Sequence, residues 1–449
     1  MRLWIRRIIF SLFALGFIVS AVGLLLYANG YRFNISSWWF EKTGVVTIDS
    51  SPTNATISLG TATTGSFWQR SISQGKPYKT PSRVTYVLPG QYHVVLSKEG
   101  FWDFARDIDV QAGVTSFFTN GILLKKEQPK QVLAVKTVRT LNLLGKTSYL
   151  VQTANDLFVV DRKSQKSEKV YHSEEEISNL LLAPSGSFAI FKTGDLWLRL
   201  DLSSTDKTIT VLKIEEGESL IFGERDMVYG CGPNGISAYP NLSRVAFKEH
   251  VSVLDCTVVD LTLYSLEVQG REVELRALPL NQLKGEEQAI AHIPSKKASF
   301  GHGDLPYLII NTDAEKTYVY NTQDPQHHLI DLDTMNMAVK YDAQTLIANN
   351  TVEIHKYHIN NTDSSKELLT REGGAISEVL VIPTIPYVFF VRDNHELIAL
   401  EQTDLNPNRY TLAAFDRIAL VLTLADKKTL LIAGVRQGVE GVFELNILE

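Results

Sequence analysis

The chain has 449 residues, of which 44% are hydrophobic and 21% are charged, and its formal net charge is -6. This length is enough for two or three globular domains, and the apolar fraction is enough for a sizeable core. The mildly acidic balance, without any long cluster of Lys and Arg, argues against a nucleic-acid-binding protein, which needs a dense basic face.

An uncharged run extends from Ile8 to Ala28 near the N-terminus. As a helix, its 21 residues would be about 31 Å long, which matches the hydrocarbon core of a bilayer. Arg2, Arg6 and Arg7 precede the run, so the positive-inside rule places the N-terminus in the cytoplasm. The sequence therefore predicts a transmembrane helix over residues 8–28.

This helix predicts a single-pass protein of the cytoplasmic membrane, because no second apolar stretch of comparable length occurs. Residues 1–7 would be a cytoplasmic tail, residues 29–43 a juxtamembrane linker, and all of residues 29–449 would be extracytoplasmic. The lipid bilayer is then the partner of residues 8–28. Aromatic residues at and beyond the end of the run suit the outer membrane interface: Tyr27, Tyr31, Trp38 and Trp39.

A cleaved signal peptide is the alternative interpretation of this run. The small residues at Val19-Ser20-Ala21 have a spacing that a signal peptidase accepts. However, the apolar run continues through Tyr27, whereas the apolar region of a signal peptide normally spans about 7–15 residues. An uncleaved anchor is therefore favoured.

Residues 44–126 have the pattern of a small antiparallel β domain, with strand-sized apolar runs separated by Gly, Pro and Asn. In residues 88–101, LPGQYHVVLSKEGF, a Pro-Gly turn precedes a strand in which Tyr92, Val94 and Leu96 alternate with more polar positions. One face of this strand should therefore be packed and the other partly exposed. His93 is expected at the sheet surface rather than as a ligand.

Three segments of this domain, SSPTNATISL, KTPSRV and VLPGQYHVVLSKEGF, are similar to the PEGA domain, a small surface-associated β module of bacteria and archaea. The matching positions are Ser50 or Ser51, Pro52, Ala55, Ile57, Thr80, Pro81, Leu88, Gly90, Tyr92, Val94, Lys98, Glu99, Gly100 and Phe101. Asn54 replaces the glycine of the tetrapeptide that names the family, and asparagine tolerates left-handed backbone angles. The resemblance implies a structural or adhesive role without catalysis, with residues 60–79 forming an extended loop.

Residues 131–449 repeat loosely, with apolar strand starts 36 to 44 residues apart. The starts are YLV (149–151), FAI (188–190), MVY (227–229), LYS (263–265), YLI (307–309), LIA (346–348), YVF (387–389) and LLI (430–432). A period near 40 with about four strands per unit is the signature of a β-propeller. We predict seven or eight blades, preferring eight, and expect the strands QVLAVKTV and TLNLLGK to complete the last unit and close the ring. A stack of β-sandwich domains is the alternative.

The predicted fold class is thus mainly β, with one transmembrane helix, a PEGA-like domain and a propeller. This combination resembles a class of prokaryotic surface proteins. The repeats have no recurrent Trp-Asp pair and no double glycine, so no particular propeller family is implied.

The two cysteines, Cys231 and Cys256, lack the spacing of a zinc site. They would form one disulfide if the domain lies outside the cytoplasm, or remain two unpaired buried cysteines. Both interpretations stay open from the sequence.

Chemical motifs are sparse, and the sequence predicts no catalytic, cofactor-binding or metal site. His302, between two glycines, is expected in a solvated turn, and His327 and His328 are adjacent, so on a strand they would point to opposite faces. Asp331, Asp333 and Asn336 only loosely resemble a calcium loop, because the glycine turn and closing glutamate are missing. One acidic run is expected to be solvated rather than part of a site: Glu174, Glu175 and Glu176. Three tryptophans are expected to be buried rather than part of a site: Trp68, Trp102 and Trp197.

These observations favour a membrane-anchored, non-catalytic scaffold or binding protein. The PEGA-like module would act as a stalk or envelope contact, and the propeller would dock an envelope protein or a cell-wall polymer. The alternative is an extracytoplasmic hydrolase or lyase with its site in the propeller funnel. A third possibility is a sensor or assembly factor that acts through a membrane partner, since a tail of seven residues cannot signal by itself.

Overall fold

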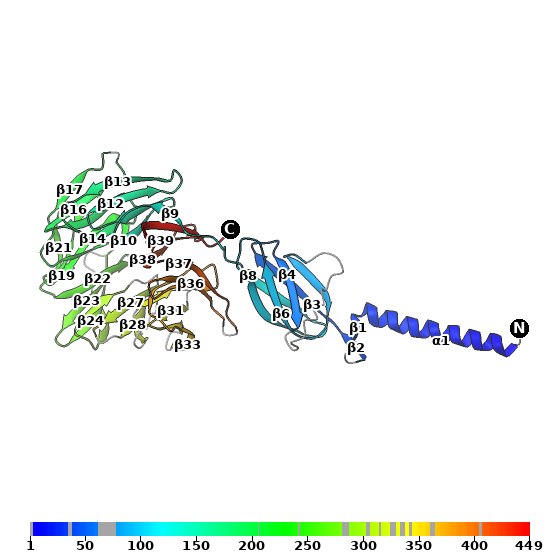
Figure 1. The fold of residues 1–449 in the computed structure, drawn as a ribbon. Helices are drawn as coiled ribbons and strands as arrows, with labels where there is room; N and C mark the ends of the chain where they lie inside the picture. Colours follow the sequence, from blue (N-terminus) through cyan, green and yellow to red (C-terminus); the bar gives the residue numbers. More distant parts are fainter. Residues whose placement is uncertain are drawn as a thin grey trace. The chain divides into compact units, whose positions relative to one another are not determined.

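The computed structural model divides the chain into two compact units, Met1–Glu127 with Ile447–Glu449, and Gln128–Asn446 (Figure 1). The structure describes residues 3–34, 38–61, 78–204, 206–240, 243–280, 287–301, 306–313, 316–323, 329–332, 337–340, 344–359, 364–403 and 406–449. The second unit therefore begins at Gln128 and ends at Asn446, whereas the sequence predicted a domain over residues 131–449.

The first unit begins with the helix α1 (Leu3–Ala28), which covers the predicted residues 8–28. Within it, Arg6–Ala28 is apolar enough and long enough to cross a membrane, with a mean hydropathy of 2.6 and no burial against the rest of the chain. A hairpin of β1 (Tyr31–Asn34) and β2 (Trp39–Lys42) follows directly. The predicted linker over residues 29–43 thus contains regular structure.

The PEGA-like module consists of two three-stranded sheets, ordered β5-β3-β8 and β4-β6-β7. The strands are β3 (Gly44–Ser51), β4 (Thr56–Thr61), β5 (Ser82–Val87), β6 (Gly90–Ser97), β7 (Phe104–Val110) and β8 (Thr115–Ile122). β3 pairs antiparallel with β5 and parallel with β8. Most of the predicted loop over residues 60–79 lies outside the described residues.

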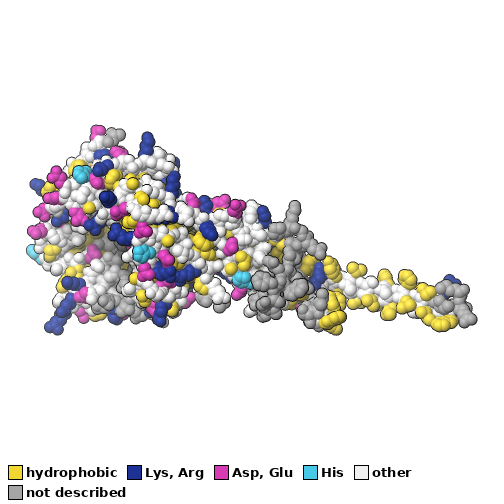
Figure 2. Space-filling model, viewed as in Figure 1, with side chains coloured by type: hydrophobic (Ala, Val, Ile, Leu, Met, Phe, Trp, Pro, Cys, Tyr) yellow, Lys and Arg dark blue, Asp and Glu magenta, His cyan; other side chains and the backbone are white. Residues whose placement is uncertain are grey.

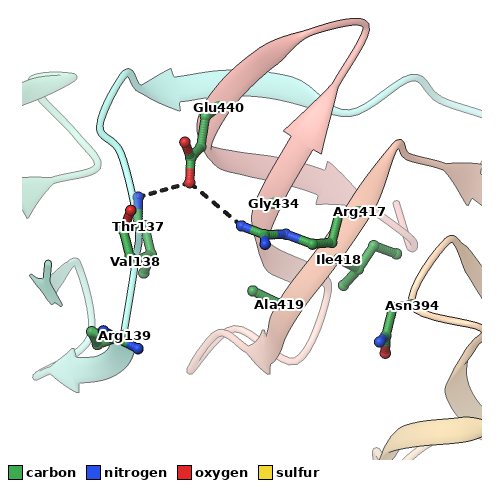
Figure 3. A pocket seen from close by; sticks show the side chains of 9 residues that line it. All are labelled: Thr137, Val138, Arg139, Asn394, Arg417, Ile418, Ala419, Gly434 and Glu440. Carbon is green, nitrogen blue, oxygen red and sulfur yellow. Dashed lines mark hydrogen bonds and ion pairs between the residues drawn. The ribbon is translucent and has the colours of Figure 1, made fainter. Parts of the chain in front are cut away.

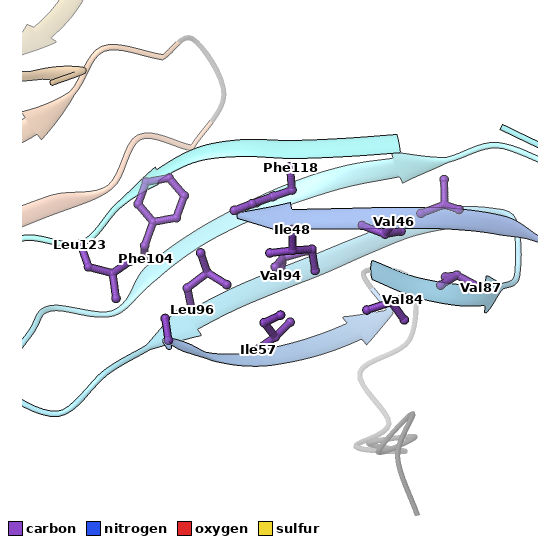
Figure 4. Packing of buried hydrophobic residues seen from close by; sticks show 12 residues of the cluster. Val46, Ile48, Ile57, Val84, Val87, Val94, Leu96, Phe104, Phe118 and Leu123 are labelled. Atoms are coloured by element: carbon purple, nitrogen blue, oxygen red, sulfur yellow. The ribbon is translucent and has the colours of Figure 1, made fainter. Parts of the chain in front are cut away.

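One apolar core holds the two sheets together (Figure 4). Val94 and Leu96 of β6 are fully buried, as the alternation in the sequence predicted. Phe104 packs edge-on against Phe118, with the ring centroids 5.9 Å apart, so β7 and β8 meet inside the core.

Within Gln128–Asn446, the described residues form eight four-stranded antiparallel sheets (Figure 1). The first four sheets contain β10 (Thr140–Leu144), β11 (Ser148–Gln152), β12 (Asp156–Asp161), β13 (Lys166–His172); β14 (Ile177–Leu182), β15 (Phe188–Thr193), β16 (Leu196–Asp201), β17 (Ile209–Leu212); β18 (Ser219–Phe222), β19 (Val228–Gly232), β20 (Gly235–Ala238), β21 (Val245–Glu249); and β22 (Val253–Val259), β23 (Thr262–Gln269), β24 (Glu272–Pro279), β25 (Gln288–Ile293). A short 3-10 helix, Glu224–Asp226, lies between β18 and β19.

The other four sheets have the same order. They contain β26 (Ala298–Phe300), β27 (Tyr307–Thr312), β28 (Thr317–Asn321), β29 (Leu329–Asp331); β30 (Met337–Lys340), β31 (Thr345–Asn349), β32 (Glu353–Ile359), β33 (Ser364–Arg371); β34 (Ile376–Val381), β35 (Tyr387–Arg392), β36 (Glu396–Glu401), β37 (Arg409–Ala414); and β38 (Arg417–Thr423), β39 (Thr429–Arg436), β40 (Val439–Asn446), with β9 (Lys130–Leu133) as the outer strand.

The sheets form a closed ring, and the predicted propeller is confirmed. First strands of successive sheets contact one another, as in β14 with β18 and β34 with β38, and β10 contacts β38 to join the first sheet to the last. β9 pairs with β40, so the last sheet combines strands from both ends of the unit. The predicted role of QVL in ring closure is therefore right, whereas TLNLL forms β10, the first strand of the first sheet.

The apolar runs that mark the repeat period do not begin the sheets of the ring. The apolar runs that mark the period, such as YVF within β35, form the second strand of each sheet rather than the first. Second strands are buried on both faces and are strongly apolar, while the first strands mix buried and accessible residues. The apolar signal in the sequence is therefore strongest at the second strand of each sheet.

Candidate binding face of the propeller

Several PEGA motif residues hold the β module together through hydrogen bonds. The Thr80 hydroxyl lies 2.6 Å from the Ser50 hydroxyl and accepts a 3.0 Å hydrogen bond from the Ala55 amide. The Thr80 backbone accepts a bond from the Asn54 amide and donates one to the Ala55 carbonyl. Thr80 and Ala55 are buried, and Asn54 has a φ of 65°, the left-handed conformation that the sequence predicted.

The remaining motif positions shape turns and strand ends. The Tyr92 hydroxyl donates to the Leu88 carbonyl across the turn, 2.9 Å away, and Phe101 packs against the core. Gly90 and Gly100 have positive φ angles. Pro81 and Glu99 are exposed, whereas Pro52 is half-buried. Both prolines follow cis peptide bonds.

His93 lies on the exposed side of β6, where its Nδ1 is 2.7 Å from a carboxylate oxygen of Asp107. Both side chains are about half exposed. This pair belongs to the sheet surface.

Cys231 of β19 and Cys256 of β22 form a disulfide bond in the structure. Their Cα atoms lie 6.2 Å apart, and the bond joins the third sheet of the ring to the fourth. The disulfide therefore braces two neighbouring sheets.

The other residues considered from the sequence form no shared site in the described part of the chain. Glu176 forms a 2.9 Å ion pair with Arg139, and Trp197 is buried in a core cluster. No group of three or more metal-ligating side chains occurs among the described residues. Several candidates lie outside the described residues: Trp68, His302, His327, His328, Asp333 and Asn336.

Two carboxyl groups on first strands have raised pKa values. Burial raises the pKa of Asp255 in β22 and of Glu378 in β34. Asp255 accepts hydrogen bonds from the amides of Cys256 and Phe300, both 2.8 Å long, so its role is to link the fourth and fifth sheets. These two acids belong to the fourth and seventh sheets, which are not neighbours in the ring.

The candidate functional site is one end of the propeller, which we call the top face. In an antiparallel four-stranded sheet, the turn between the second and third strands lies at the same end as the connection to the next sheet. The top face is thus built from inter-sheet connections and from turns between second and third strands. Surface connections carried on a rigid scaffold are the usual location of binding residues.

One pocket of about 310 Å³ lies on this face where the seventh, eighth and first sheets meet (Figure 3). Arg139 and Thr137 come from the connection before β10, Arg417 begins β38, and Glu440 is the second residue of β40. The Glu440 carboxylate accepts a 2.7 Å hydrogen bond from the Thr137 amide and lies 3.7 Å from an Arg417 nitrogen. The full lining is Thr137, Val138, Arg139, Asn394, Arg417, Ile418, Ala419, Gly434 and Glu440.

Two further pockets continue along the top face on either side. One, of about 320 Å³, is lined by Gly373, Gly374, Arg392, Asp393, His395 and Glu396, so it adjoins the first pocket through the turn that carries Asn394. The other, of about 350 Å³, shares Thr137 with the first pocket and reaches the turn between β11 and β12. These three pockets lie along the top face over three adjacent sheets, and we refer to them together as the trough.

The walls of this trough are fixed by backbone hydrogen bonds. The Asp393 amide donates to the Ala375 carbonyl, and the Ile418 amide donates to the Asn394 carbonyl. One turn of the seventh sheet is therefore bonded to the connection before that sheet and to the first strand of the eighth sheet. Such bonds hold the lining residues in place without a ligand.

The buried carboxylate of Glu372 lies directly before Gly373, which lines the second pocket. Glu372 accepts two hydrogen bonds of 2.7 Å from the Arg409 guanidinium and lies 3.3 Å from an Arg392 nitrogen. Burial tends to raise the pKa of Glu372, but hydrogen bonds from Arg409 and Thr370 and the two positive charges hold it below its usual value. This network fixes Arg392 beside the second pocket.

Arg139 and Arg417 present positive charge in the first pocket. Their side chains are 52% and 60% exposed, so both guanidinium groups remain open to solvent although each has one acidic neighbour. Guanidinium groups with neighbouring amide and hydroxyl groups suit recognition of carboxylates and other polar groups. The sequence carries no signal for this pair, because Arg139 and Arg417 lie about 280 residues apart and only ring closure brings them together.

Comparisons with known proteins agree with this architecture. Residues 43–120 match the PEGA domain family, so the chain contains a PEGA domain. No curated protein matches the sequence at a significant level.

Solved structures match the propeller. The C-terminal WD40 domain of Sif2 superposes with a TM-score of 0.50 at 8% identity, covering 71% of this chain and 98% of that chain. The dihydro-heme d1 dehydrogenase NirN, solved in complex with DHE, gives a TM-score of 0.51 at 13% identity, covering 70% of this chain and 76% of that chain. At such identities the likeness shows the propeller fold alone.

Proposed function

We propose that this chain is a non-catalytic, membrane-tethered binding protein whose propeller docks an envelope protein or a cell-wall polymer. A PEGA domain joined to a propeller is typical of a surface or binding protein. The observation that carries the proposal is the trough on the top face, with Arg139 and Arg417 exposed in it. The PEGA domain would then serve as a stalk or envelope contact between anchor and propeller.

The proposed topology places residues 8–28 in the cytoplasmic membrane, the N-terminus inside, and residues 29–449 outside. The arginines before the helix support this orientation. The disulfide between Cys231 and Cys256 also supports it, because disulfides form and persist in oxidising compartments. Protease added to cells stripped of any outer layer should digest both units, and their protection would contradict this topology.

Docking is tested by placing a photo-crosslinking amino acid at Gln437, in an exposed turn of the top face, in the full-length protein in cells. The matched control is Ser164, exposed in the turn between β12 and β13 at the opposite end of the sheets. We expect a reproducible adduct from Gln437 that is absent from Ser164 and weakened by Arg139→Ala with Arg417→Ala. Equal adducts from both positions, or an adduct that the arginine variants leave unchanged, would contradict docking in the trough.

A further inference from the structure

The hairpin β1–β2 has an unusual concentration of exposed aromatic side chains. Trp38 is 76% exposed, Trp39 73%, Phe33 48% and Phe40 40%. Figure 2 shows hydrophobic side chains continuing from the helix to its hairpin end. Adjacent large apolar side chains left in water mark an interaction surface, whereas single ones are ordinary.

The aromatic side chains are arranged rather than scattered. Phe33 pairs directly across the hairpin with Phe40, their ring centroids 5.4 Å apart, and Trp38 packs edge-on against Phe33 at 6.1 Å. Trp39 pairs with Asn34, so it lies on the opposite face of the hairpin. Apolar rings are thus presented on both faces, as expected for an element surrounded by a partner.

Arg32 joins the helix, the hairpin and the PEGA domain. Its guanidinium carbon lies 3.5 Å from the ring centroid of Tyr27 in the helix and 3.8 Å from that of Tyr86 in β5. It also donates hydrogen bonds to the carbonyls of Tyr27 and Tyr31. Such a cation between two aromatic rings fixes the hairpin at the end of the helix.

The position of the hairpin along the chain identifies its partner. The apolar span Arg6–Ala28 would be about 34 Å long as a helix, slightly more than the roughly 30 Å of a hydrocarbon core. Only two residues separate Ala28 from β1, so the hairpin begins within about 10 Å of the membrane boundary. Trp and Tyr are enriched at that depth, because their rings suit a zone that is partly apolar and partly wet.

We propose that the β1–β2 hairpin is a lipid-binding element that lies in the outer interface of the bilayer, with Phe33, Trp38, Trp39 and Phe40 among the headgroups and upper acyl chains. This inference rests on the proposed membrane anchoring of the helix. It adds that the PEGA domain is held at the membrane surface through Arg32 instead of moving freely on a linker. The partner is phospholipid rather than a second copy of the chain, because the helix already carries the hairpin to the interface.

The test uses the full chain reconstituted in phosphatidylcholine–phosphatidylglycerol vesicles whose acyl chains are brominated either near the headgroup or near the methyl end. The fluorescence difference between wild type and Trp38→Phe/Trp39→Phe reports these two tryptophans alone. We expect strong quenching of this difference signal by the shallow bromines and weak quenching by the deep ones. The difference signal of the matched control Trp102→Phe, in the PEGA domain, should respond to neither lipid.

Each other outcome overturns the inference in a recognisable way. If the chain floats with carbonate-washed vesicles but the Trp38 and Trp39 signal is not quenched, the anchor stands and the hairpin inference is wrong. If that signal is also shielded from iodide in water, protein rather than lipid covers the hairpin. If the chain does not float with the vesicles, the membrane anchoring and the hairpin inference fail together.

Discussion

Thr80 connects three segments of the PEGA domain through one buried side chain. Its hydroxyl contacts Ser50 of β3 and the Ala55 amide before β4, while Thr80 itself precedes β5. A threonine is needed here because valine has the same shape but neither donates nor accepts. The motif position is thus explained by hydrogen bonding inside the fold.

Thr80→Val should lower the free energy of unfolding of the PEGA domain by about 1–3 kcal/mol, since the buried Ala55 amide would lose an acceptor. Hydrogen exchange of the full-length protein should show faster exchange at Ala55 and its neighbours. Thr85→Val, at an exposed position of β5, is the control and should change little. Equal exchange in both variants would remove the structural role assigned to Thr80.

Glu372 predicts a pH-dependent stability of the propeller. Its pKa is lowered in the folded protein, so its charge contributes stability that is present above the unfolded value of about 4.5 and is lost as pH falls through the folded pKa. Arg409→Met removes the bidentate partner and should cost roughly 1–3 kcal/mol near neutral pH, less than for a fully buried pair because Arg409 is partly exposed.

Denaturant unfolding from about pH 7 to about pH 3 measures this effect. The difference between wild type and Arg409→Met should shrink as the pH falls, because protonated Glu372 no longer needs the arginine. Lys166→Met, at an exposed position of β13, should give a small difference that is constant with pH. A constant deficit for Arg409→Met would show that its packing matters rather than the ion pair.

At the scale of elements, the sequence identifies strands far better than it identifies sites. Apolar runs such as YVF near residue 387 are predictable because second strands are buried on both faces. The strand that begins each sheet is harder to predict, because buried and accessible residues alternate less clearly in first strands such as β34. The trough is less predictable still, since Arg139, Arg417 and Glu440 share no motif and meet only when β9 pairs with β40.

Ring closure depends on a glycine. A Cβ at Gly441 of β40 would lie 2.2 Å from the Leu133 carbonyl oxygen of β9, so any larger residue must push β9 away. Gly441→Ala should destabilise the propeller by about 1–3 kcal/mol and speed hydrogen exchange in β9. Gly373→Ala, where a Cβ would meet nothing within 4 Å, is the control. Unchanged protection of β9 would show that closure tolerates the displacement.

The disulfide between β19 and β22 should contribute a second constraint on the ring. It closes a loop over a sequence separation of 25, for which loop entropy gives about 3.5 kcal/mol. Cys231→Ala/Cys256→Ala should therefore unfold at lower denaturant concentration than the oxidised wild type. Reductant should lower the stability of the wild type towards that of the variant and leave the variant unchanged. If reductant also lowered the stability of the variant, the loss of stability in the wild type could not be assigned to this disulfide.

At the scale of the whole molecule, the chain crosses between its two units twice. It leaves the first unit after Glu127 and returns at Ile447, so in the sequence the propeller is inserted between two segments of the first unit. The Lys125 amide donates a 2.9 Å hydrogen bond to the Ile447 carbonyl, and Lys98 forms a 2.8 Å ion pair with Glu449. The C-terminal residues thus complete a domain whose other residues come from the N-terminal part of the chain.

Ile447→Ala should weaken the PEGA domain, although the two sites are more than 300 residues apart in the sequence. Ile447 is fully buried, so its truncation should cost about 2–5 kcal/mol and speed hydrogen exchange of the Lys125 amide. Glu449→Gln changes only an exposed ion pair and should cost less than about 1 kcal/mol. Equal exchange in wild type and Ile447→Ala would mean that the first unit is complete without its C-terminal residues.

By the same reasoning, a fragment that ends at Glu127 should be less stable than the same residues in the full chain.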